Sequence, residues 1–149
     1  MHMVEKKKHI LMIDDDPTIQ RLFGAKLSAK GFEVLYAHDA ETGRETARRL
    51  SPDLILLDIR MPGMDGFQTA KLLRGEERTK NMPVVFLTNE DLSMEGEKWA
   101  KELWVSDYIH KSTDLNEIVS RVKKILKQVE TSQQIKEETK PQSSNETKK

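Results

Sequence analysis

The sequence predicts an α/β fold with a doubly wound, five-stranded parallel sheet and helices on both faces. Five short apolar runs alternate with segments of helical character over 149 residues, and they lie at 9–13, 32–37, 53–58, 83–88 and 107–110. The runs at 54–57 and 84–87 are apolar on both faces, which is typical of parallel strands covered from both sides. Right-handed crossovers between such units build a three-layer sandwich.

The first helix is expected between the runs at 9–13 and 32–37. Asp16 and Pro17 supply an N-cap and a proline for the first turn, so Asp16 is expected to serve the helix rather than a metal. Gly31 is placed to end the helix. An apolar stripe at helical spacing supports it, made of Ile19, Leu22, Phe23 and Leu27.

Capping residues mark the later helices in the same way. Asp39 can cap the second helix and Asp65 the third, while Thr113 and Asp114 can open the last one. The last helix has a long apolar stripe that ends near residue 129, made of Leu115, Ile118, Val119, Val122, Ile125, Leu126 and Val129. We therefore predict a lead-in over residues 1–7, one domain over 8–129 and a disordered polar tail over 130–149.

Composition excludes several classes of function. Lys plus Arg equals Asp plus Glu at 25 each, which gives no footprint for nucleic acid. No cysteine is present, which removes disulfides, thiolate catalysis and cysteine-based metal sites, and the four histidines lack metal-ligand spacing. The first apolar run is too short for a signal peptide or a membrane span, so we expect a cytoplasmic protein.

Polar side chains follow four of the expected strands. Asp14 and Asp15 end the first strand, Asp58 the third and Thr88 the fourth, and Lys111 follows the fifth. Because the carboxyl ends of parallel strands form the functional edge of such a sheet, these groups should converge. Two carboxylates about 4 Å apart repel by roughly 4 kcal/mol at an effective dielectric near 20, so the cluster needs a cation.

Magnesium suits this cluster, since it takes one or two carboxylates together with waters and phosphate oxygens. A carboxylate can also accept a phosphoryl group when cations neutralise the phosphoryl oxygens. Asp58 is the candidate nucleophile, because it stands alone at the end of the central strand.

The blocks "IDDDPTIQRLF", "DLILLDIRMPGMDGF", "VVFLTNE" and "DYIHKS" closely resemble the signature blocks of bacterial two-component response-regulator receiver domains, over about residues 8 to 128. The resemblance implies a flavodoxin-like strand order 2-1-3-4-5 and phosphorylation of Asp58 to an aspartyl phosphate. It implies that Mg²⁺ is held by Asp15 directly, by Asp14 through water, and by Asp58 and the backbone carbonyl of Arg60.

The same resemblance assigns the remaining roles. Lys111 and Thr88 would contact the phosphoryl oxygens, and Thr88 and Tyr108 would form the conformational switch. The phosphoryl group would come from a sensor histidine kinase, a phosphotransfer protein or a small phosphodonor, with no enzymatic activity beyond self-phosphorylation and self-dephosphorylation. A protein target would read the fourth helix, fifth strand and fifth helix, with the chain a monomer or a phosphorylation-dependent dimer that has no DNA-binding or membrane role.

The chain departs from the family pattern at several positions. Ser112 replaces the proline that usually follows the lysine in a cis peptide, and Asn89 replaces a small residue. Trp104 replaces a helix-ending glycine, and Arg60 and Glu90 are positioned to pair across the mouth of the site.

These departures leave two alternative functions open. One is a binding module of the same fold that is not phosphorylated. The other is a magnesium phosphohydrolase that uses the Asp14-x-Asp16 spacing, although the downstream block at 56–66 fits it poorly.

Overall fold

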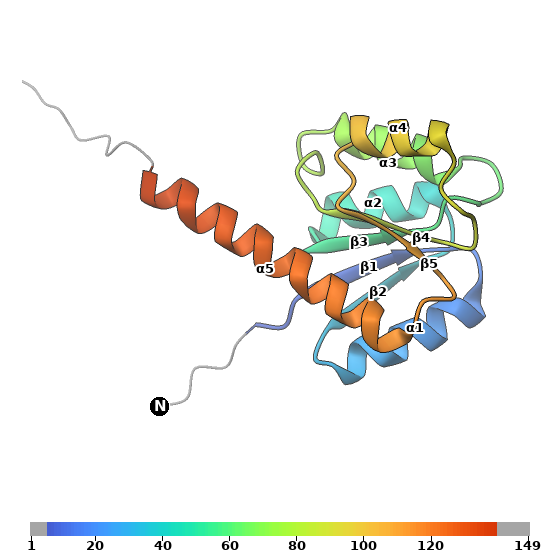
Figure 1. Ribbon diagram of the computed structural model, residues 1–149, viewed down its shortest axis with the longest axis horizontal. Coiled ribbons are helices and arrows are strands. Elements are labelled where there is room, and N and C mark those ends of the chain that lie inside the picture. The colour runs from blue at the N-terminus through green and yellow to red at the C-terminus, as the bar shows by residue number, and fades with distance from the viewer. Residues whose placement is uncertain (1–5, 140–149) are drawn as a thin grey trace, which may run out of the picture.

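Five parallel strands form one sheet in the order β2-β1-β3-β4-β5, as the sequence predicted. The computed structural model describes residues 6–139 (Figure 1). The strands are β1 (His9–Ile13), β2 (Glu33–Ala37), β3 (Leu54–Leu57), β4 (Val84–Thr88) and β5 (Asp107–His110). They alternate with the helices α1 (Pro17–Ala29), α2 (Ala40–Leu50), α3 (Gly66–Arg74), α4 (Met94–Glu102) and α5 (Leu115–Thr139).

Each face of the sheet has its own hydrophobic core. Ile10 and Met12 of β1 pack in a cluster with residues of α1 and α5, whereas Leu11 and Ile13 pack with residues of α2, α3 and α4. Figure 1 shows the same division, with α1 and α5 on one side of the strands. All four residues of β3 are buried, as expected of a central strand that is covered on both faces.

The predicted helix starts are confirmed. The Asp16 carboxylate accepts hydrogen bonds from the backbone N–H groups of Thr18 and Ile19, and the Asp39 carboxylate accepts one from Thr42. Asp65 forms a reciprocal capping box, in which its carboxylate accepts from the N–H group of the third helical residue. These caps fix where the loops after the strands turn back into helices.

In α1 the predicted helix end is confirmed, and one member of the predicted apolar stripe is not buried. Gly31 follows α1 with φ of +96°, so it occupies the left-handed conformation that glycine tolerates. Leu22, which the apolar stripe of α1 included, is 52% exposed and lies outside the core.

The predicted end of the last helix near residue 129 is wrong, because α5 continues to Thr139. Its packed part ends near Leu126, and Val129 is half-buried, whereas residues 130–138 are exposed. Figure 1 shows the C-terminal part of α5 extending away from the sheet. Lys, Gln and Glu are good helix formers, and extending an existing helix adds one hydrogen bond for each residue ordered. A polar segment therefore stays helical without burial, and the predicted disorder is wrong over 130–139.

The remaining parts of the predicted lead-in and tail, residues 1–5 and 140–149, lie outside the described residues. None of the helices between residues 6 and 139 combines the length and the apolar character that crossing a membrane would need.

Hydrogen bonds close the C-terminus of α4 and fasten α5 to β5. Trp104 takes a left-handed conformation with φ of +52° after α4, and its N–H donates to the Lys101 carbonyl while that of Val105 donates to Ala100. This is a Schellman motif with tryptophan at the position that glycine usually fills. Arg121 of α5 donates to the Asp107 carboxylate at 2.6 and 2.8 Å and to the Tyr108 carbonyl at 3.2 Å, which ties α5 to β5.

Candidate functional site

The functional edge of the sheet is where strand order reverses, between β1 and β3. Neighbouring strands β1 and β3 are parallel, and the Asp58 N–H donates to the Ile13 carbonyl at 2.9 Å. Asp14 and Asp58 therefore leave adjacent strands at the same edge. Carboxylate oxygens of Asp14, Asp15 and Asp58 lie within 4.8 Å of one another.

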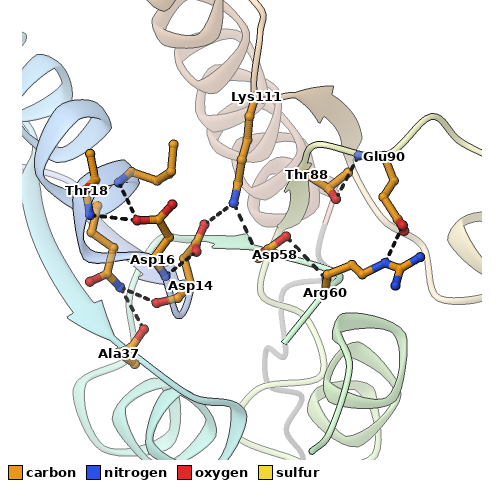
Figure 2. Close-up of polar contacts among 11 residues, drawn as sticks. Asp14, Asp16, Thr18, Ala37, Asp58, Arg60, Thr88, Glu90 and Lys111 are labelled. Atoms are coloured by element: carbon orange, nitrogen blue, oxygen red, sulfur yellow. Dashed lines mark hydrogen bonds and ion pairs between the residues drawn. The ribbon is translucent and has the colours of Figure 1, made fainter. Parts of the chain in front are cut away.

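Lys111 reaches into this group of acids, as Figure 2 shows. Its ammonium lies 2.7 Å from the Asp14 carboxylate and 3.3 Å from that of Asp58, and all three side chains are nearly buried. Burial alone would lower the pKa of Lys111, but the hydrogen bond and charge of Asp14, and then Asp58, outweigh it and raise the pKa. Lys111 is thus held as a cation inside the site.

Asp58 carries a perturbed carboxyl group. Its burial first, and then the negative charge of Asp14, raise the pKa of Asp58 above its ordinary value, although Lys111 opposes the shift. The Arg60 N–H lies 3.4 Å from the second carboxylate oxygen. Since the single charge of Lys111 is shared between two acids, the site keeps excess negative charge for a further cation.

A cleft of about 480 Å³ opens above these residues. It is lined by Asp15, Asp16, Pro17, Asp58, Arg60, Thr88, Asn89, Glu90 and Lys111. Asp14 does not line it and is 2% exposed, so it lies beneath the floor, whereas Asp15 is exposed. The cleft therefore brings together Asp15, Asp58, Thr88 and Lys111, which the sequence placed at four different strand ends.

The oxygen donors of this cleft fit a magnesium ion. Carboxylates are hard ligands, Mg²⁺ needs only one or two of them, and open space remains for water and phosphate oxygens. Asp15 and Asp58 both reach the cleft, and Asp14 supports them from below through its bond to Lys111.

Thr88 and Tyr108 meet at one loop residue. Thr88 is buried, and its hydroxyl oxygen accepts a hydrogen bond from the Glu90 N–H at 3.3 Å. The Tyr108 hydroxyl donates to the Glu90 carbonyl at 2.7 Å, and its ring packs edge-on against Phe86 at 6.1 Å. Tyr108 does not line the cleft, so any influence on the site runs through this loop.

The expected ion pair across the mouth of the site is present. Arg60 and Glu90 pair through the guanidinium Nε, and both residues line the cleft (Figure 2). Arg60 remains largely exposed, so the pair closes one side of the cleft without filling it.

The loop after β5 does not need the strained peptide that the missing proline suggested. Between residues 6 and 139 every peptide bond is trans, including that between Lys111 and Ser112. Lys111 nevertheless reaches both Asp14 and Asp58, which answers the question of where the lysine points.

The phosphohydrolase alternative loses its structural support. Asp16, its proposed second acid, uses its carboxylate to cap α1, and its own N–H donates to Asp14 at 2.9 Å. Asp14 lies below the cleft in an ion pair with Lys111, so the Asp14-x-Asp16 spacing does not present two acids to a substrate in the cleft.

Gln20 is a site residue that sequence reasoning missed. Gln20 is 3% exposed, and its side-chain amide donates to the carbonyls of Asp14 and Ala37, each at 2.9 Å. It thereby fastens α1 to the ends of β1 and β2 and fixes the backbone that carries the acids. The sequence did contain a signal for it. Gln20 lies three residues before Phe23 and seven before Leu27, so it is a polar residue on the buried face of α1.

Comparison with known proteins agrees with this geometry. The family model described as the response regulator receiver domain matches residues 10–123. The chain is 36% identical over 121 residues to the DNA-binding dual master transcriptional regulator RpaA of Synechocystis, with 81% of this chain and 50% of RpaA covered. It is 33% identical to Protein PilH of Pseudomonas aeruginosa, where 78% of this chain and 96% of PilH are covered.

Solved structures give the same result. The BeF₃-activated receiver domain of RstA from Klebsiella pneumoniae aligns with a TM-score of 0.72 and 33% identity, covering 80% of this chain and 98% of that domain. The chemotaxis protein CheY4 of Vibrio cholerae aligns with a TM-score of 0.75 and 25% identity, covering 80% of this chain and 98% of CheY4. The chain spans about half the length of RpaA, so the match concerns that part alone. With the acidic cleft, the matched family model and these relatives in agreement, the chain belongs to the response regulator receiver domain family, a family of signalling domains.

Proposed function

We propose that this receiver domain accepts a phosphoryl group on the carboxylate of Asp58 and signals through contacts with other proteins. The observation that carries the proposal is the position of Lys111, whose ammonium lies 3.3 Å from Asp58 at the floor of an open acidic cleft. A cation at that distance can neutralise charge on phosphoryl oxygens during transfer.

The transfer is a nucleophilic displacement at phosphorus. An Asp58 oxygen forms a bond to phosphorus, and the bond to the donor's leaving group breaks, so that the donor keeps the electron pair. We assign the contacts with the phosphoryl oxygens to Lys111 and the Thr88 hydroxyl, and the position of both residues in the lining of the cleft supports this assignment. Because Asp14 holds Lys111 from below, losing Asp14 would leave the ammonium less well directed.

We assign the Mg²⁺ site of the cleft to Asp15, Asp58 and the backbone carbonyl of Arg60, with Asp14 acting through a bound water. Support comes from the three carboxylates within 4.8 Å of one another and from the position of Arg60 at the same cleft. When bound, Mg²⁺ would neutralise phosphoryl charge and the repulsion among the acids.

Receiver domains work with histidine kinases or phosphotransfer proteins, and we propose such a protein as donor here, which implies a cytoplasmic location. The proposed output surface is formed by α4, β5 and α5, and the proposed switch by Thr88 and Tyr108. Tyr108 is suited to this role because its hydroxyl contacts the loop that also holds Thr88. The chain would be a monomer, or a dimer that forms on phosphorylation, which light scattering with and without phosphodonor distinguishes.

Intact-mass measurement tests the proposal. The folded protein with Mg²⁺ and acetyl phosphate should gain the mass of one phosphoryl group, whereas Asp58→Asn, and wild type with EDTA, should gain none. Asp65→Asn is the matched control, because it removes a carboxylate but keeps a side chain able to cap α3. No added mass on folded wild type would support the binding-module alternative and contradict the proposal.

A further inference from the structure

The imidazole of His110 connects the loop after β4, which begins next to Thr88, with the loop after β5, which contains Lys111. Its Nε2 atom lies 2.9 Å from the Asn89 carbonyl oxygen, in the loop after β4. Its Nδ1 atom accepts from the Ser112 N–H at 3.1 Å and lies 2.7 Å from the Ser112 hydroxyl, in the loop after β5. A single ring therefore spans the edge of the sheet between these loops.

These contacts define one protonation state of the ring. A backbone N–H can only donate, so Nδ1 must be the unprotonated acceptor. The Asn89 carbonyl can only accept, so Nε2 must carry the proton. The neutral Nε2–H tautomer is the form that satisfies both contacts.

The two anchored residues are each the immediate neighbour of a site residue. Asn89 follows Thr88, and Ser112 follows Lys111. His110 also pairs with Thr88 in the register of β4 and β5, and the Lys111 N–H donates to the Thr88 carbonyl at 2.8 Å. The contacts of His110 with Asn89 and Ser112, together with the hydrogen bond from the Lys111 N–H to Thr88, thus fix the backbone on either side of Lys111.

This restraint matters because Lys111 must extend a flexible side chain to two buried carboxylates. Its peptide bond to Ser112 is trans, and Ser112 has no ring to stiffen the loop. The contacts of His110 supply a fixed geometry at that point, and they go to loop atoms rather than to the hydrophobic cores.

We propose that His110 is a positioning residue that clamps the loops after β4 and β5 and so directs Lys111 and Thr88 at the acceptor cleft. The proposal rests on the proposed function of Asp58. It assigns no contact between His110 and the phosphoryl group. Its effect should therefore fall on the rate of transfer at saturating phosphodonor, not on magnesium affinity.

The clamp has two arms, the contact of Nε2 with Asn89 and the contacts of Nδ1 with Ser112, and substitutions can test them separately. His110→Phe keeps an aromatic ring and removes both arms, His110→Asn keeps an acceptor near the Nδ1 position, and His110→Gln keeps a donor near the Nε2 position. Ser112→Ala removes the hydroxyl contact and keeps the N–H contact. His9→Phe is the matched control, because His9 begins β1 at the opposite end of the sheet.

The rate of phosphorylation is measured against acetyl phosphate concentration, with folding checked by circular dichroism and magnesium affinity by calorimetry. His110→Phe should lower the maximal rate by on the order of tenfold to a hundredfold, as expected of a misplaced catalytic group. His110→Asn and His110→Gln should each recover part of the rate. Magnesium affinity should stay close to wild type in every variant, and so should the maximal rate of His9→Phe. Ser112→Ala, which keeps the N–H contact, should lose less of the rate than His110→Phe.

Nitrogen NMR of the histidine rings gives a readout that does not depend on phosphorylation. The His110 ring should show the Nε2–H tautomer, and the Ser112 amide should exchange faster in His110→Phe than in wild type. A folded His110→Phe protein with the wild-type maximal rate, or an Nδ1–H tautomer in wild type, would overturn the clamp. If wild type takes up no phosphoryl group, the proposed function fails. The clamp is then tested by the tautomer of His110 and by the exchange rate of the Ser112 amide.

Discussion

Replacing Asp15 by asparagine tests whether the three acids form a cation site. The carboxylate oxygens of Asp14, Asp15 and Asp58 lie within 4.8 Å of one another, and Lys111 compensates one of the three charges. Asp15 therefore faces two negative charges and one positive charge, which amounts to repulsion by about one net negative charge. At 4.8 Å this repulsion is worth about 0.9 kcal/mol in water and about 3.5 kcal/mol at an effective dielectric of 20.

Because Asp15 is exposed, the value should lie near the lower limit. We expect Asp15→Asn to raise the free energy of unfolding by about 1 kcal/mol in the absence of metal. Magnesium should stabilise wild type much more than Asp15→Asn. At ten times its Kd it stabilises wild type by about 1.4 kcal/mol, whereas it should add little to Asp15→Asn.

Urea unfolding with EDTA and with MgCl₂ measures both effects at matched ionic strength. Asp16→Asn is the control, since asparagine also caps helices and Asp16 is assigned no metal contact, so the response to magnesium should remain. The cation-site reasoning is refuted if Asp15→Asn is less stable than wild type in EDTA, or if magnesium stabilises both proteins equally.

Three further predictions concern stability. Gly66→Ala should destabilise by about 2–3 kcal/mol, because its Cβ would lie 2.4 Å from the Asp58 carbonyl oxygen, whereas Gly75→Ala, with its nearest atoms at 3.6 Å, should be neutral or slightly stabilising in chemical denaturation. Trp104→Gly should stabilise by about 1 kcal/mol in the same assay, since it relieves a left-handed conformation at an exposed residue. Glu76→Gln should cost about 1 kcal/mol at neutral pH, because hydrogen bonding to arginine lowers the pKa of Glu76.

The sign of the Glu76 effect follows from its lowered pKa. The ionised form is favoured in the folded state, so its stabilisation is present above the pKa of the unfolded chain and is lost as the pH falls through the folded pKa. The difference between wild type and Glu76→Gln should therefore shrink below about pH 4.3. A difference that is constant across this range, a Gly66→Ala protein as stable as Gly75→Ala, or a destabilised Trp104→Gly would contradict the respective arguments.

Local signals were sufficient for much of the fold. The caps at Asp16, Asp39 and Asp65 and the strand ends were predictable, because capping and alternation depend on neighbours in the sequence. The end of α5 was not, since low hydrophobicity was read as disorder although intrinsic helix propensity favours continuation of the helix.

The sequence was sufficient to predict which residues gather at the candidate site, but it was not sufficient to predict which side chains contact one another there. The convergence of Asp14, Asp15 and Asp58 follows from strand ends, and the Arg60–Glu90 pair follows from two rim positions. The position of Asp14 beneath the cleft and the contacts of Gln20 and His110 depend on side-chain direction in three dimensions. Spacing along one sequence does not encode that information.

The extended part of α5 has a mechanical consequence. About ten residues lie beyond the half-buried Val129, and at 1.5 Å per residue they form a rod of about 15 Å. Arg121 fastens the packed part of the same helix to β5 next to Tyr108. The arm from Arg121 to Thr139 is about 27 Å long, so a tilt of roughly 10° at that fastening would move the far end by about 5 Å. The helix is therefore a lever that enlarges small shifts in β5.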